Sequence, residues 1–134
     1  MTTPNQESAA IELVRRFFGR INEGDFDAAI DLLAEDVFYH NIPLPEIRGR
    51  ENVRQFHKRF GVGTRIRVDW QLRRIAQDGD NVLTERLDLF LADNGARIEL
   101  PTMGSMTVVD GAITEWRDYF DLASFERQAA AMGD

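Results

Sequence analysis

The spacing of apolar residues changes once along this chain, near Gly61, and that change constrains the fold more than any other feature. Before Gly61, residues such as Ile11 and Val14 recur at the three- and four-residue spacing of amphipathic helices. After it, residues such as Ile66 and Val68 alternate with arginines, which is the pattern of a half-buried strand. Helices followed by strands predict an α+β fold.

The first half of the chain predicts three helices. The first should begin with a capping box over residues 3–6 and end at the polar, glycine-containing residues 22–25. Asp25 can cap the second helix, which should continue through Leu33. The third should lie between the glycines that enclose residues 49–61.

Three Asp/Asn-Gly turn signals, at residues 78–79, 93–95 and 110–111, divide the second half into strands. We expect four strands of an antiparallel meander, near residues 65–76, 81–91, 96–109 and 112–120. A further strand is expected at residues 37–42 and a last helix at residues 124–132. Together they predict a curved, mixed or antiparallel sheet, closed by the N-terminal helices into a cone with one deep internal pocket.

Length and composition narrow the function. The 134 residues fit one domain, over residues 1–134, and the absence of cysteine excludes disulfides, thiolate zinc sites and cysteine nucleophiles. A net charge of −7 argues against nucleic-acid binding. The sequence contains no apolar run long enough to span a membrane and its first ten residues contain no signal-peptide core, so we expect a cytoplasmic domain without membrane insertion.

Charged residues share strand faces with large aromatic residues. In residues 82–91 the even positions include Arg86, Asp88 and Phe90, whereas the odd positions are mostly leucine. In the last strand, Trp116 and Asp118 lie on one face. One interpretation buries the leucines and leaves the charges in solvent. The other lines the cone with the charges, where an Arg between two carboxylates supplies the pairing that buried charges need.

The second interpretation has a consequence for assembly. If Arg86 and Asp88 point into the cone, the leucine face becomes the convex side of the sheet and needs another cover. A second subunit is the simplest cover, so we expect a homodimer. A terminal helix is the alternative cover.

Three short motifs resemble the limonene-1,2-epoxide hydrolase family, within the nuclear-transport-factor-2-like, or SnoaL-like, α+β cones. They are Y-H-N-I-P-L-P at residues 39–45, E-R-L-D at 85–88 and W-R-D-Y-F-D at 116–121. The similarity extends from about residue 11 to residue 125. Because this fold supports many activities, the motifs carry more weight than the fold alone.

The resemblance implies a role for each motif residue. Asp118 would be the general base, Asp88 the general acid that protonates the epoxide oxygen, and Arg86 the bridge between them. Tyr39 and Asn41 would orient the attacking water. The implied reaction adds water to an apolar, cyclic or terpene-like epoxide in one step, gives a vicinal diol and uses no cofactor.

The same face provides a candidate binding surface for an apolar substrate. Phe90, Trp116 and Phe120 share the faces that carry the charged residues. We therefore expect these three aromatic side chains to surround the reacting groups.

Other sequence features weigh against alternative functions. His40 and His57 are the only histidines and lack metal-ligand spacing, so we expect no metal. Ser105 has no nucleophile-elbow motif around it. A ketosteroid-isomerase-like proton-transfer enzyme remains an alternative, although Phe17 and Phe18 stand on the first helix where such isomerases carry a tyrosine. A non-catalytic cone that binds an apolar ligand is the other alternative.

Overall fold

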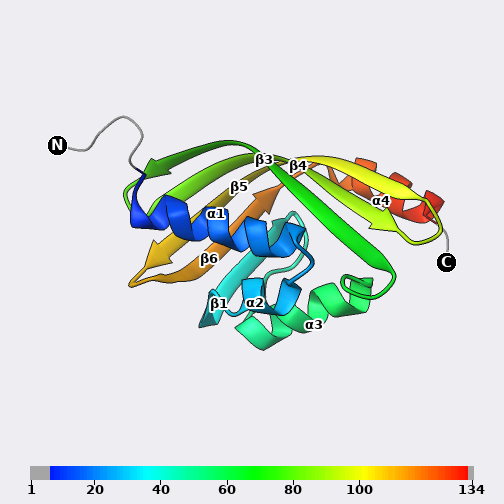
Figure 1. The fold of residues 1–134 in the computed structure, drawn as a ribbon. Coiled ribbons are helices and arrows are strands. Elements are labelled where there is room, and N and C mark those ends of the chain that lie inside the picture. The colour runs from blue at the N-terminus through cyan, green and yellow to red at the C-terminus, as the bar shows by residue number, and fades with distance from the viewer. Residues whose placement is uncertain (1–6, 133–134) are drawn as a thin grey trace.

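The computed structural model describes residues 7–132, shown as a ribbon in Figure 1. Helices pack against a curved, six-stranded sheet. The elements in chain order are α1 (Ala9–Asn22), α2 (Phe26–Ile30), β1 (Leu33–Ile42), β2 (Ile47–Arg48), α3 (Arg50–Phe60), β3 (Ile66–Asp78), β4 (Asn81–Ala92), β5 (Arg97–Val109), β6 (Ala112–Tyr119) and α4 (Leu122–Ala131). None of the helices in residues 7–132 is both long and apolar enough to cross a membrane.

The sheet has the strand order β2-β1-β6-β5-β4-β3. Strands β3 to β6 form the predicted antiparallel meander, and β1 pairs with β6 in parallel. The α+β cone is therefore confirmed, with a sheet that curves without closing.

In the first half, one predicted element boundary is wrong and one short strand was not predicted. Leu33 is the first residue of β1 rather than part of a helix, because α2 is only five residues long. The short strand β2 was not predicted, since two residues are too few to show a period in the sequence.

The predicted capping box at residues 3–6 lies outside the described residues. Within them, α1 begins at Ala9, and the Ser8 hydroxyl accepts a hydrogen bond from the Ile11 amide. Asp25 occupies the N-cap position of α2 but makes no side-chain capping hydrogen bond. At the end of α3, Gly61 has a φ of 111°, a left-handed conformation that terminates the helix as predicted.

Helix α1 crosses the sheet and covers its concave face (Figure 1). Its residues Phe17 and Phe18 are almost fully buried. The Phe17 ring packs edge-on against Trp116 of β6, with ring centroids 5.1 Å apart. The core therefore lies between the N-terminal helices and the concave side of the sheet. The even-numbered residues of β4 point to that side, as do Trp116 and Asp118 of β6.

Candidate active site

The charged residues of β4 and β6 lie inside the protein. Arg86, Asp88 and Asp118 are 3 %, 4 % and 5 % exposed. The interpretation that placed them on a solvated outer face is therefore wrong. Three charges buried together require direct pairing, because each would otherwise lose its hydration without compensation.

Arg86 provides that pairing through four hydrogen bonds to the two carboxylates, and a fifth goes to Thr84. It donates to Asp88 from Nε at 3.0 Å and from Nη2 at 2.8 Å. It donates to Asp118 from Nη1 at 3.0 Å and from Nη2 at 2.9 Å, and Nη1 also donates to the Thr84 hydroxyl at 3.2 Å. The planar guanidinium holds both carboxylates bidentately, which a lysine could not do.

The sheet register explains how side chains from separate strands meet. Thr84 of β4 pairs with Gly104 of β5, which pairs with Asp118 of β6, which pairs with Asn41 of β1. Strand β5 lies between Arg86 and Asp118, so a side chain there would obstruct their contact.

Gly104 leaves that path open. A Cβ at this position would lie 2.6 Å from Asp118 Oδ1 and 2.7 Å from Arg86 Nη1, closer than non-bonded atoms approach. Glycine is therefore required here by the close approach of two side chains rather than by backbone conformation.

The two carboxylates and the guanidinium retain one negative charge when all three are ionised. Burial raises the pKa of Asp88 above its ordinary value, although Arg86 pulls it downward. Burial opposes the charge of Arg86, yet Asp118 and Asp88 together hold the pKa of Arg86 above its ordinary value. The surroundings of Asp88 therefore favour a bound proton.

Tyr39 and Asn41 lie on β1 beside Trp116 and Asp118 of β6. The Asn41 amide Nδ2 donates to the Tyr39 hydroxyl at 2.8 Å. Burial, and then the negative charge of Asp118, raise the pKa of Tyr39 well above its ordinary value, so this side chain is a neutral phenol. The structure thus brings all five predicted polar residues to one region.

A cavity of about 290 Å³ opens over this region. Asp88, Asp118, Tyr39 and Asn41 lie in its wall, whereas Arg86 lies behind the two carboxylates. The remaining lining residues are mostly apolar or aromatic: Leu44, Phe56, His57, Phe60, Trp70, Phe90, Leu100, Thr102, Phe120 and Phe125. The site is therefore a small polar patch within an apolar pocket.

Two of the three predicted substrate-binding aromatic residues line this cavity. Phe90 and Phe120 are in its wall, but Trp116 is not. The Trp116 ring is fully buried behind Tyr39, with centroids 4.3 Å apart, and it stacks on His57. Trp116 therefore supports the wall of the pocket instead of contacting its contents.

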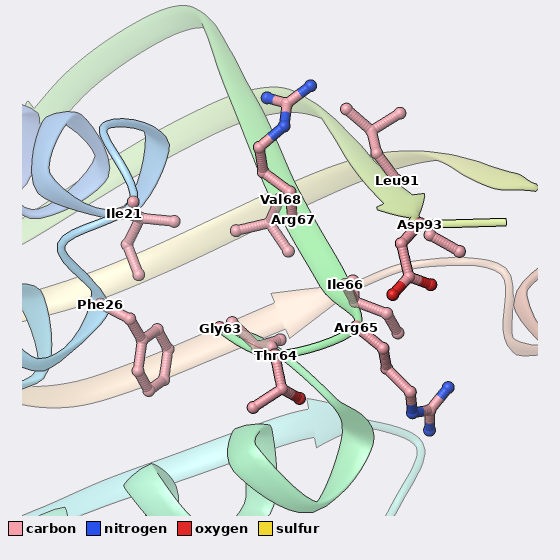
Figure 2. Close-up of a pocket in the computed structure, with 13 residues that line it drawn as sticks. Ile21, Phe26, Gly63, Thr64, Arg65, Ile66, Arg67, Val68, Leu91 and Asp93 are labelled. Atoms are coloured by element: carbon pink, nitrogen blue, oxygen red, sulfur yellow. The ribbon is translucent and has the colours of Figure 1, made fainter. Parts of the chain in front are cut away.

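A second hollow, of about 450 Å³, lies where the α1–α2 turn approaches the first residues of β3 and the end of β4 (Figure 2). Its lining residues include Ile21 and Phe26. The guanidinium groups of Arg65 and Arg67 point away from one another in Figure 2, and Asp93 is its one acidic lining residue. This hollow lacks a pair of facing carboxyls, so we place the candidate active site in the smaller cavity.

Several residues of the site were missed from the sequence, among them His57 and Gly104. His57 is buried and its Nε2 lies 3.3 Å from the Tyr39 hydroxyl. It follows Val53 by four residues on α3, which was a signal of an inward position. Gly104 could also have been noticed, because a glycine in the interior of a strand often marks a close approach.

The alternatives can be compared with the same geometry. Helix α1 presents Phe17 and Phe18 to the core, so the structure provides no tyrosine at the position expected for an isomerase-like site on that helix. His40 and His57 are engaged separately, with Leu44 and with Tyr39. Within residues 7–132, no group of three or more His, Asp or Glu side chains is arranged to hold a metal.

The fold and site together define a class, the NTF2-like or SnoaL-like α+β cone with a carboxylate–arginine–carboxylate cluster in its pocket. Solved structures of an NTF2-like protein from Burkholderia pseudomallei and a SnoaL-like protein from Jannaschia share the fold, with TM-scores of 0.79 and 0.76. They cover 92 % and 98 % of this chain, and 98 % of each of those chains is covered, at 20 % and 16 % identity.

Within that class, the chain belongs to the limonene-1,2-epoxide hydrolase family, whose catalytic-domain model matches residues 8–130. It is 34 % identical over 109 residues to epoxide hydrolase EphG of Mycobacterium tuberculosis. The aligned residues cover 81 % of this chain and 71 % of EphG. The solved structure of an epoxide hydrolase of this family type from M. tuberculosis has a TM-score of 0.79 and 32 % identity, over 92 % of this chain and 90 % of that one.

Proposed function

We propose that this protein hydrolyses an apolar epoxide to a vicinal diol in one step, with Asp118 as general base and Asp88 as general acid. The observation that carries the proposal is the Arg86 guanidinium held between two buried carboxylates beside an apolar cavity. Family membership supports the same reaction class.

The proposed step balances through two proton transfers. Water attacks one epoxide carbon and gives a proton to Asp118 while the carbon–oxygen bond breaks. Asp88 gives its proton to the departing oxygen, so no free alkoxide forms. A proton then returns from Asp118 to Asp88 to restore the starting state. Each transfer contributes about 10²–10⁴-fold to the rate of such reactions.

The remaining polar residues would hold the reactants in position. Tyr39 and Asn41 hydrogen-bond one another beside Asp118, where an attacking water would lie. Phe90 and Phe120 would contact the apolar part of the substrate. Because the two carboxyls supply both proton transfers, the proposed reaction requires no metal and no organic cofactor.

The direct attack of water can be tested by isotope labelling. In a single turnover in H₂¹⁸O, with enzyme in excess over a cyclic or terpene epoxide and a chelator present, we expect one ¹⁸O atom in each diol. The reason is that the new hydroxyl comes from water rather than from a carboxylate of the protein. Mass spectrometry of the diol measures the label.

The other outcomes of that experiment are also informative. An unlabelled diol would show that an enzyme carboxylate attacked the epoxide and that a covalent ester formed. Recovery of unchanged epoxide bound to the protein, across a panel of cyclic and terpene epoxides, would favour the non-catalytic binding cone.

We also propose that a second copy of this chain covers the convex face of the sheet. Leu83, Met103 and Tyr119 are 43 %, 53 % and 48 % exposed there, and the register places Met103 beside Tyr119. Exposed apolar side chains this close together favour association. We expect sedimentation at micromolar concentration to give a dimer mass and Met103→Glu to shift it toward the monomer. A wild-type monomer would contradict this assembly.

The location in the cell stays a prediction from the sequence. We expect the protein in the cytoplasm, because the sequence contains no apolar run long enough to span a membrane and its first ten residues contain no signal-peptide core.

A further inference from the structure

We infer that His57 is a positioning residue that sets the direction of the hydrogen bonds at the active site, so that the Tyr39 hydroxyl accepts a hydrogen from the attacking water. This inference rests on the proposed function. The inference adds a role for a buried histidine outside the carboxylate–arginine cluster.

The hydrogen bond to Val53 identifies the tautomer of His57. Its Nδ1 lies 3.0 Å from the backbone carbonyl oxygen of Val53, one turn earlier on α3. A carbonyl oxygen only accepts, so Nδ1 must carry the proton and donate it. In the neutral ring, Nε2 then has a lone pair and no hydrogen.

The His57 ring is neutral, and its packing fixes its orientation. Burial lowers the pKa of His57 from its ordinary value to about 4, despite the negative charge of Asp118 nearby. The ring stacks on Trp116 with an interplanar angle of 4° and packs against Phe26 and Phe56. At neutral pH, His57 is therefore a rigidly held acceptor.

The Tyr39 hydroxyl has one hydrogen to donate and two sites at which it can accept. Its oxygen lies 3.3 Å from His57 Nε2, and since Nε2 can only accept, Tyr39 donates its one hydrogen there. Asn41 Nδ2 occupies one accepting site at 2.8 Å. One accepting site remains, and it can take a hydrogen only from a donor such as water.

The direction of the Tyr39 hydrogen bond affects the reactivity of the attacking water. A water that gives one hydrogen to Asp118 and the other to Tyr39 keeps its lone pairs for the epoxide carbon. If Tyr39 donated to the water instead, one lone pair would be engaged and the water would be a weaker nucleophile. His57 therefore acts through Tyr39 and without touching the substrate.

Paired variants test this role in the complete protein. In His57→Phe an aromatic ring is kept at this position, but the Nε2 acceptor and the Nδ1–H that donates to Val53 are both lost. We expect kcat to fall about 3- to 10-fold with KM unchanged, the size of effect that one neutral hydrogen bond produces. His57→Gln retains an acceptor oxygen, and we expect its kcat to stay within about 3-fold of wild type, on the same scale.

A double-mutant cycle separates positioning from packing. In a Tyr39→Phe background the hydroxyl is absent, so we expect His57→Phe to have no additional effect on kcat. An equal loss of kcat in both backgrounds would overturn the inference, because His57 would then act independently of Tyr39.

A measurement without substrate keeps the inference distinct from the proposed function. In ¹⁵N-histidine NMR of the wild-type protein near pH 7, we expect the His57 signals of a ring protonated at Nδ1 with an unprotonated Nε2. Only His40 and His57 contribute signals, so a spectrum of His57→Gln assigns them. A proton on Nε2 would overturn the inference even if epoxide hydrolysis is observed. Failure of wild type to form diol would reject the proposed function alone.

Discussion

Asp118→Asn should reduce kcat for epoxide hydrolysis by about 10³-fold, because the amide cannot take a proton from water. Asp118 is 5 % exposed and lies in the wall of the apolar cavity, so no other base is expected to replace it. We expect the fold to be retained, since Arg86 keeps its two hydrogen bonds to Asp88, whose carboxyl can ionise and balance the guanidinium charge. Initial rates of diol formation and urea unfolding are the two measurements.

A matched control isolates the position from the chemistry of the change. Asp78 is exposed at the end of β3, far along the strand from the residues that line the cavity. Asp78→Asn removes the same charge and should leave kcat unchanged. An Asp118→Asn variant with substantial activity would mean that a different group is the general base.

Removing the arginine is expected to act differently. Arg86→Ala would leave Asp88 and Asp118 buried near one another without a cation. Loss of one partner from a buried ion pair commonly costs about 3–5 kcal/mol. The aspartate variants are therefore the better test of chemistry, and an arginine variant mainly reports on stability.

Gly104→Ala should have the second large effect, although Gly104 makes no contact with substrate. The added Cβ would lie within 2.6–2.7 Å of Asp118 and Arg86, so the guanidinium bridge must shift. A displacement of about 1 Å at a reacting group can cost about 10²-fold in rate. We also expect a loss of about 1–3 kcal/mol in the free energy of unfolding, as for other overpacked sites.

Gly19→Ala is the control for the glycine substitution. Gly19 lies within α1, and a Cβ there would meet nothing within 4 Å. This variant should have wild-type kcat and equal or greater stability, because alanine favours a helix by about 1 kcal/mol over glycine. Wild-type kcat in Gly104→Ala would show that the ionic cluster can move without loss of activity, which contradicts the tight geometry on which the mechanism depends.

Much of this architecture follows from local patterns in the sequence. The alternation in residues 82–91 predicted the strand β4 and put Arg86 and Asp88 on one face, because side chains of a strand alternate whatever surrounds it. The turn residues located the ends of the meander strands for a similarly local reason.

The same patterns could not identify which face is buried. Both interpretations of β4 satisfy the alternation, and the choice depends on the packing of α1 against the sheet, which is a long-range contact. The Phe18 ring covers the Arg86 guanidinium at 4.7 Å, so residues 68 positions apart complete the burial of the site.

The sequence by itself therefore determined the α+β class, the motifs and the family, because each of these is carried by neighbouring residues. Only the tertiary structure decided that Arg86 reaches Asp118 across Gly104, that Trp116 lies behind the pocket wall, and that His57 meets Tyr39. Those contacts join residues from different elements through strand register and helix packing. A pattern in one segment shows which side chains share a face, but it does not show which residue of another element each of them meets.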